Sequence, residues 1–309
     1  MKQLAIAIIL ATLCLSCAPK QEKQTVKSGP AKSYRFRYVQ PPTMATEEQQ
    51  MLYMRDHFWD KFDFADSLWI SKGDSTDMMR AYVAYVANFV GPLNQEPIRK
   101  LMQKASVSKP MFEYFVSLSE KLLHDPNSPY RSDELYIAVL EAQIASPFYD
   151  KYEKMAPEYD LRIASQNRIG HPANDFDYTV KSGKTKSLYS LKSDFVIVYI
   201  NNPGCAMCRD ITTALKQSSI ISEMQRKGQL KILAIYPDED LNEWHKHYAD
   251  IPAEWVNGYD RGCHIGRENL YNISAIPALY LLDKSKTVLV KDSTNVSEIE
   301  FALSQYKMQ

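Results

Sequence analysis

The stretch that decides the fold is NNPGCAMCRD, residues 201–210. It contains two cysteines, Cys205 and Cys208, separated by two residues. The apolar run FVIVYI (195–200) comes before them and is typical of a strand that is buried on both faces. A segment of helical character follows, extending to about Arg226. The pair therefore stands between a strand and a helix, and it could be a redox couple, half of a metal site, or two small core residues.

The chain after Gly170 predicts an α/β domain. Short strands are expected around a turn within DFDYTVKSGKTKSLYSL (175–191), and further strands at LKILAIY (230–236), PALYLLD (277–283) and KTVLV (286–290). Helical segments stand between several of these strands. Such alternation predicts a mostly parallel sheet that is covered on both faces.

The chain before Gly170 has a different pattern, which predicts helices. Apolar residues recur every three or four positions, for example at Met79, Val83, Val86 and Val90, which places them on one stripe of a helix. Ser132 is a candidate N-cap for a later helix. We expect an all-α domain over residues 44–168 without catalytic residues. Its aromatic side chains are expected to pack in the core rather than line a ligand groove; they include Trp59, Trp69, Tyr82 and Phe112.

The first residues, MKQLAIAIILATLCLSC (1–17), predict a targeting signal. One lysine precedes the apolar run Leu4–Leu15, which is too short to span a membrane and fits a secretory signal. The run ends in a Leu-Ser-Cys sequence that resembles a bacterial lipoprotein signal, in which the first cysteine of the mature protein carries lipid. Cys17 fits that position, and a plain secretory signal is the alternative. Residues 18–43 are rich in Lys, Gln, Ser and Pro and predict a flexible tether.

Length and charge limit the possible functions. The 309 residues suffice for about two domains. Lys plus Arg and Asp plus Glu both total 37, which argues against a nucleic-acid-binding protein because such proteins need a basic surface. Export would place the mature chain in an oxidising compartment, where cysteine redox chemistry operates. Beyond the signal, the cysteines are Cys205, Cys208 and Cys263.

A Cys-x-x-Cys pair between a buried strand and a helix is typical of a thioredoxin-like redox motif. The free N–H groups and the dipole at the N-terminus of a helix favour a thiolate there. Cys205 precedes the helix and can face solvent, so we expect it to be the nucleophile. Cys208 lies one turn further in, where the chain shields it, and we expect it to be the resolving cysteine.

Two segments, 169–208 and 268–290, resemble thioredoxin-like thiol–disulfide oxidoreductases, in particular the membrane-tethered TlpA/ResA type. Residues 169–309 are covered, and the resemblance implies a thioredoxin-like α/β fold there. It also implies that the Ile276–Pro277 bond is cis and that Pro277 packs beside the cysteine pair. The helical half resembles an uncharacterised N-terminal domain that is fused to such modules. One departure is Tyr199, which occupies the strand position where many thioredoxins bury an acid.

The expected function is therefore an exported thiol–disulfide oxidoreductase on the periplasmic side of a bacterial membrane, anchored by lipid. Its partners would be client proteins with thiols or disulfides and an upstream thiol donor or acceptor, and it needs no cofactor. One alternative is a thioredoxin-fold lipoprotein that only binds. Another is a zinc protein in which Cys263 and His264 complete a set of four ligands with the pair. Otherwise Cys263 is expected to be a buried, inert thiol, and His247 a surface residue.

Overall fold

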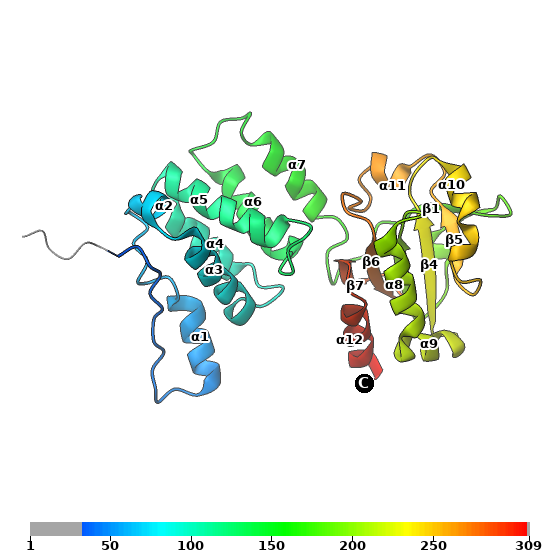
Figure 1. Ribbon diagram of the computed structural model, residues 1–309, viewed down its shortest axis with the longest axis horizontal. Helices are drawn as coiled ribbons and strands as arrows, with labels where there is room; N and C mark the ends of the chain where they lie inside the picture. Colours follow the sequence, from blue (N-terminus) through cyan, green and yellow to red (C-terminus); the bar gives the residue numbers. More distant parts are fainter. Residues whose placement is uncertain (1–32, 308–309) are drawn as a thin grey trace, which may run out of the picture. The chain divides into compact units, whose positions relative to one another are not determined.

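The structure is a computed structural model that describes residues 33–307 (Figure 1). The predicted signal peptide, the lipidation site Cys17 and the tether up to residue 32 lie outside the described residues. From Tyr34 onward the described residues form one compact unit. Within residues 33–307, no helix has both the length and the apolar character that crossing a membrane requires.

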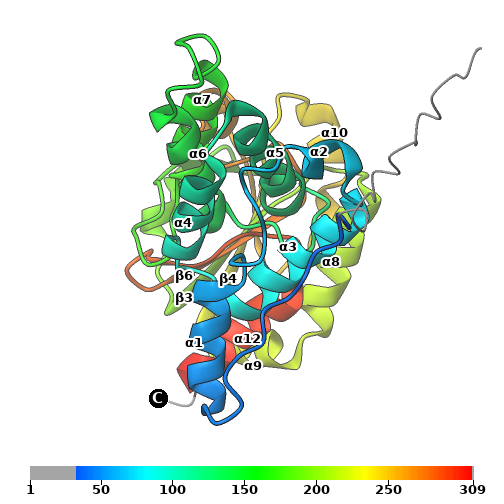
Figure 2. The same cartoon turned by 90° about the vertical axis from the view of Figure 1, so that its left-hand side faces the viewer.

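Residues 47–164 contain only helices and turns, as the apolar spacing predicted (Figure 2). The N-caps follow the sequence. Asp74 accepts hydrogen bonds from two backbone N–H groups, and Ser132 accepts one from Leu135, which satisfies donors that a helix start leaves free. The elements are α1 (Glu47–His57), α2 (Leu68–Lys72), α3 (Ser75–Phe89), α4 (Glu96–Ala105), α5 (Lys109–Ser119), the π-helical η1 (Glu120–His124), α6 (Asp133–Ala145) and α7 (Met155–Ala164).

The aromatic residues of this part form its core. Trp59 is only 3% exposed and lies against the rings of six neighbours: Phe36, Phe58, Phe62, Tyr82, Tyr85 and Phe115. The buried Tyr82 hydroxyl is paired with the hydroxyl of Ser119 at 2.7 Å. Core packing, and not a ligand groove, therefore accounts for the aromatic content, because such rings bury a large apolar area.

The C-terminal end of the predicted tether was wrong, because its last residues belong to the helical core. Phe36 and Val39 are buried in the helical core. The backbone N–H of Phe36 also donates to the Asp77 carboxylate at 2.7 Å. Burial of these two side chains is favourable enough to hold an extended segment against the helices, so the chain joins the core near Tyr34 and not after residue 43.

The second part is an α/β structure built on one sheet of the described residues, with strand order β2-β1-β5-β4-β3-β6-β7. Its strands are β1 (Asp177–Val180), β2 (Thr185–Ser187), β3 (Phe195–Ile200), β4 (Leu230–Tyr236), β5 (Val256–Tyr259), β6 (Ala278–Asp283) and β7 (Val288–Ser293). Its helices are η2 (Leu188–Ser190), α8 (Ala206–Gln217), α9 (Ser219–Arg226), α10 (Leu241–Lys246), η3 (Tyr248–Asp250), α11 (His264–Arg267) and α12 (Val296–Lys307).

The expectation of a mostly parallel sheet was wrong, because the sheet is mixed. Strand β4 runs parallel to β3 and β5, whereas the other neighbouring pairs are antiparallel. The physical reason lies in the connections. The hairpins β1–β2 and β6–β7 have short turns, which can join only antiparallel strands. Apolar runs of the kind seen in the sequence occur in parallel and in antiparallel strands, so they did not reveal the strand direction.

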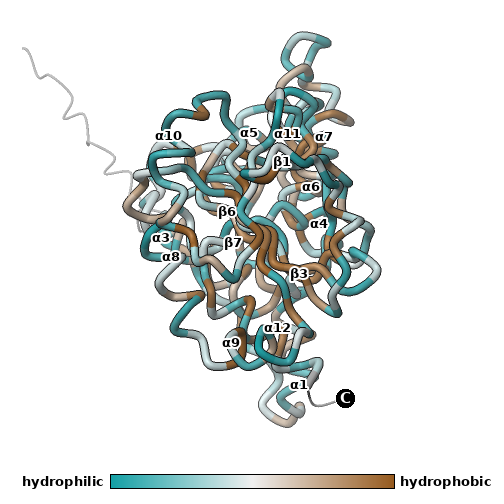
Figure 3. Tube along the Cα trace, turned by 90° about the vertical axis from the view of Figure 1, so that its right-hand side faces the viewer, coloured by the Kyte–Doolittle hydropathy of each residue, from teal (hydrophilic) through white to brown (hydrophobic). Residues whose placement is uncertain are grey.

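Strand β3 is central, and its side chains alternate between two cores. Ile197 and Tyr199 point into a cluster covered by α8, α9 and α12. Val196, Val198 and Ile200 point into the opposite cluster, which includes α11 and residues 169–191. In Figure 3 the hydrophobic colour concentrates on the central strands β3 and β6. The sequence FVIVYI is therefore apolar at every position because both of its faces are covered.

Candidate active site

The cysteine pair lies where β3 ends and α8 begins. The connecting loop places Gly204 at a φ of +72°, a left-handed conformation that glycine adopts at little cost. Cys205 is the N-cap of α8, and its sulfur accepts a hydrogen bond from the backbone N–H of Cys208 at 3.3 Å. Cys205 is half-buried, Cys208 is 4% exposed, and both are free thiols. The structure thus brings the two predicted residues together at the start of the helix.

Burial sets the electrostatics of Cys208. Loss of hydration raises the pKa of the Cys208 thiol to about 12, and its hydrogen bond with the Cys205 sulfur acts in the same direction. The backbone of Asn202 and the hydroxyl of Tyr199 oppose this shift of the pKa. Cys208 is therefore a neutral thiol at neutral pH, because burial disfavours the charged form.

Tyr199 lies directly beneath the pair. It is fully buried, and its hydroxyl donates to the Cys208 carbonyl oxygen at 2.6 Å. The Thr212 hydroxyl lies 3.2 Å from the Tyr199 phenol oxygen. Burial raises the pKa of Tyr199 above its ordinary value, so the phenol is a hydrogen-bonding group and not a charged one. The sequence showed only that no acid stands here; the contact with Cys208 comes from the fold.

The Ile276–Pro277 peptide bond is cis, as the resemblance implied. Pro277 immediately precedes β6, and Ala278 pairs with Ile200, the last residue of β3. Since the cysteine loop leaves β3 at Ile200, the cis peptide lies at the same end of the sheet as the pair. Ile276 and Cys205 both pack against the apolar cluster that contains Cys208. The role of Pro277 in the reaction remains a prediction.

A pocket of about 280 Å³ opens beside the two cysteines. Besides the pair it is lined by Tyr199, Thr212, Arg209, Lys216, Trp244, His247, Asp250 and Asn257, among others. The His247 ring is held by a contact between Nδ1 and the Asp250 carboxylate at 2.8 Å. The same ring lies close to the cysteine loop, since a Cβ on Gly204 would be 3.7 Å from the His247 Nε2. His247 was expected on a solvent-facing helix surface, and nothing in the local sequence indicated this position.

The zinc alternative finds no ligand set in the described part of the chain. No three His, Cys, Asp or Glu side chains among residues 33–307 gather as a metal ion requires. The ring of His264 instead contacts Glu268 through Nδ1 at 2.8 Å.

Cys263 has a φ of +55° at the start of α11 and is only half-buried, so the expectation of a buried thiol was wrong. Residual burial nevertheless raises the pKa of Cys263.

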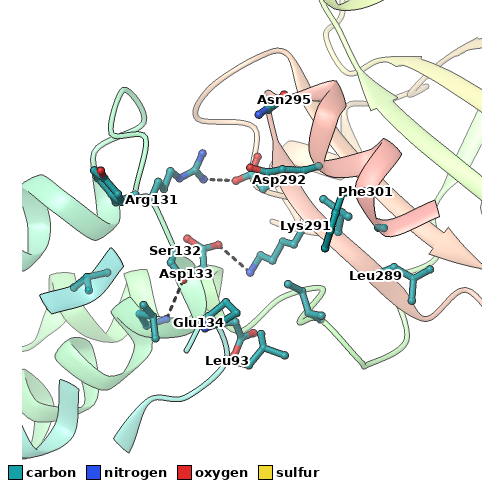
Figure 4. A pocket seen from close by; sticks show the side chains of 18 of the residues that line it. Leu93, Arg131, Ser132, Asp133, Glu134, Leu289, Lys291, Asp292, Asn295 and Phe301 are labelled. Carbon is teal, nitrogen blue, oxygen red and sulfur yellow. Dashed lines mark hydrogen bonds and ion pairs between the residues drawn. The ribbon is translucent and has the colours of Figure 1, made fainter. Parts of the chain in front are cut away.

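A larger pocket, of about 740 Å³, does not include the cysteines (Figure 4). Four of its charged side chains form two ion pairs. Arg131 is paired with Asp292, and Lys291 lies 2.9 Å from Asp133. Burial raises the pKa of Asp292 to about 7, and the adjacent Arg131 acts in the opposite direction. These four groups already have partners, and the cysteine pair lies in the smaller pocket.

The burial of Cys208 predicts how it reacts with an alkylating agent. In the reduced protein at neutral pH, label should enter Cys205 first, because Cys208 is shielded and its pKa is about 12. Only the thiolate reacts, so the rate at Cys208 should rise about tenfold for each pH unit below that pKa. Mass spectrometry of quenched samples measures both rates. Faster labelling of Cys208 than of Cys205 at neutral pH would contradict the geometry, and the unfolded protein, with nearly equal rates, is the control.

The comparisons with known proteins agree with this fold. The family model described as Thioredoxin-like matches residues 193–288, and a model for a domain of unknown function, DUF5106, matches residues 14–167. A solved structure of a thioredoxin-like protein from Bacteroides caccae is 41% identical, covers 90% of this chain and 100% of its own, and has a TM-score of 0.83. This chain therefore belongs to the thioredoxin-like proteins, with an N-terminal DUF5106 domain before the thioredoxin-like one.

Two further solved structures cover a smaller share of this chain. The C-terminal domain of an uncharacterized protein from Bacteroides fragilis is 46% identical over 45% of this chain and 98% of its own, with a TM-score of 0.44. The thioredoxin domain of a thiol-disulfide oxidoreductase from Bacteroides vulgatus is 19% identical over 45% of this chain and 97% of its own, with a TM-score of 0.40. No curated protein matches this chain.

Proposed function

We propose that this chain is an exported, lipid-anchored thiol–disulfide oxidoreductase that exchanges a Cys205–Cys208 disulfide with client proteins. The observation that carries the proposal is the unequal pair at the start of α8. The Cys205 thiol is half-exposed at the N-cap and accepts a hydrogen bond from the backbone N–H of Cys208 at 3.3 Å, whereas the Cys208 thiol is buried. Such a pair can join a client in one step and release it in the next.

In the reducing direction, the Cys205 thiolate attacks one sulfur of a client disulfide. The client S–S bond breaks, the departing client sulfur takes up a proton from solvent, and a mixed disulfide forms on Cys205. Cys208 then loses its proton and attacks the Cys205 sulfur. The second client sulfur leaves, and the pair ends as a disulfide. An upstream thiol donor returns two electrons, and the reverse sequence oxidises a client.

A turnover assay separates the proposed activity from the alternatives. The full mature chain should reduce a protein test disulfide such as that of insulin when a small thiol is supplied, at a rate far above that of the thiol alone. A lipoprotein that only binds would add nothing to the background rate. A zinc protein would carry one equivalent of zinc after purification and lose its accessible thiols to the metal. Absence of turnover with several unrelated disulfides would remove the proposal.

Lipid attachment at Cys17 is the prediction on which membrane anchoring depends. Expressed in a bacterium with its first 17 residues intact, the chain should incorporate labelled palmitate and appear in the membrane fraction. Cys17→Ala should lose both the label and the membrane association, whereas Cys14→Ala, three residues earlier in the same signal, should keep them. Label that persists in Cys17→Ala would contradict the predicted anchor.

A further inference from the structure

The second step of the proposed exchange requires a buried thiol, Cys208, to ionise. Cys208 has to become a thiolate while it is 4% exposed, in an apolar cluster that contains Ile211 and Leu279. A buried charge without hydrogen bonds is strongly disfavoured. In the mixed disulfide the Cys205 sulfur is already bonded to the client, so it can no longer take the proton. The backbone of Asn202 opposes the effect of burial on the pKa of Cys208, and a side-chain group beside it would further stabilise the Cys208 thiolate.

We infer that the Tyr199 hydroxyl is that group, acting as the hydrogen-bond donor that stabilises the Cys208 thiolate during resolution. The inference rests on the proposed function. Tyr199 is fixed by its place on the central strand β3, and its hydroxyl already reaches Cys208 through the carbonyl oxygen at 2.6 Å. Its ring packs edge-on against Trp255. The donor is therefore held in place before the charge forms, so little reorganisation is needed.

The contacts of the hydroxyl suit a donor to an anion. The same hydroxyl lowers the pKa of the Cys208 thiol against the effect of burial. Thr212 lies 3.2 Å from the phenol oxygen and can donate to it, which strengthens the phenol as a donor. Because burial raises the pKa of Tyr199 itself, the phenol keeps its proton while it stabilises the thiolate.

The step balances with Tyr199 unchanged at its end. The Cys208 proton passes to water, for which the 280 Å³ pocket lined by Cys208 and Tyr199 has room. The O–H of Tyr199 turns from the Cys208 carbonyl toward the sulfur. The thiolate forms the Cys205–Cys208 bond, and the bond between Cys205 and the client breaks. The hydroxyl then returns to the carbonyl oxygen.

Ellman's reagent resolves the two steps in the full reduced chain, with Cys263→Ala present in every variant so that this half-buried free thiol releases no coloured thiol of its own. The first equivalent of coloured thiol reports attack by Cys205, and the second reports resolution by Cys208. Tyr199→Phe should leave the first phase unchanged and slow the second about tenfold, as expected for loss of one hydrogen bond to a charged group. The slowing should diminish as pH rises and Cys208 ionises without help, so the pH profile of the second phase should move to higher pH.

The matched control is Tyr280→Phe, on the neighbouring strand β6. The Tyr280 hydroxyl is also buried, but it has no hydrogen-bond partner among the described residues, so its removal should change neither phase. A purely structural role for Tyr199 would instead lower thermal stability without moving the pH profile. Equal second phases in Tyr199→Phe and the unaltered chain at every pH would overturn the inference, and so would equal slowing of both phases.

A second variant keeps the test decisive if Tyr199→Phe does not fold. Thr212→Val should slow only the second phase, by about two- to threefold, because the phenol loses a donor that strengthens it; an unchanged second phase would then overturn the inference. Failure of the proposed function would give a different result with Ellman's reagent from failure of the inference about Tyr199. In that case the unaltered chain itself would release one equivalent of coloured thiol from the pair and never form the Cys205–Cys208 disulfide.

Discussion

Cys205→Ala should abolish turnover of a test disulfide and should form no covalent adduct with any client. Cys205 is the half-exposed thiol at the N-terminus of α8. Without it, the attack that starts exchange has no nucleophile, because Cys208 is buried and its pKa is about 12. The loss should reach the background rate of the added small thiol.

Cys208→Ala should also stop turnover, but with a different product. Cys205 still attacks, and the mixed disulfide accumulates because nothing resolves it. Non-reducing gels and mass spectrometry should detect the adduct, and a reducing agent should release the client. Cys263→Ala is the control, since Cys263 does not line the pocket beside the pair, and it should retain nearly full turnover. Activity in Cys205→Ala, or adducts formed through Cys208, would reverse the assigned roles.

Trp59→Ala should have the largest effect on stability. The indole is 3% exposed and meets aromatic rings from several elements of the helical part, so its removal leaves a cavity that these rings cannot fill. The expected loss in the free energy of unfolding is about 3–5 kcal/mol. Denaturant unfolding followed by circular dichroism measures it.

Tyr152→Ala is the matched control, because Tyr152 is an aromatic residue of the same part but is 69% exposed. Its effect should stay within about 0.5 kcal/mol. A loss below about 1 kcal/mol for Trp59→Ala would mean that the helical core repacks around the missing ring, contrary to the close ring contacts described above.

Residues with a strong local pattern were predicted correctly. The run FVIVYI identified β3 because a strand covered on both faces is apolar at each position. The cysteine pair followed it at the start of a helix, so its place could also be predicted. The direction of the strands could not be predicted, because β6, which is antiparallel to β3, is as apolar as β4, which is parallel to β3. Periodicity reports which faces are buried, and not which way the chain runs.

The surroundings of the pair were harder to predict than the pair itself. Tyr199 is one more apolar residue of a buried strand until the fold places its hydroxyl 2.6 Å from the Cys208 carbonyl oxygen. His247 belongs to a polar segment far along the chain, yet it lines the same pocket. Such contacts arise from tertiary packing of distant elements, and no local spacing encodes them. The burial of Phe36 was also missed, because the polar sequence around it is compatible both with a flexible tether and with an extended segment that packs against the core.

The central claim is that Cys205 and Cys208 form a reversible two-electron couple, and a redox titration tests it most directly. The full chain is equilibrated in glutathione buffers of graded potential, quenched with an alkylating agent and weighed by mass spectrometry. The structure predicts one transition in which both thiols are lost together, with about 30 mV for each tenfold change in the ratio of oxidised to reduced protein. Cys263→Ala should keep this transition and Cys205→Ala should lose it. Persistence of two free thiols at every potential, or their separate loss as glutathione adducts, would contradict the claim.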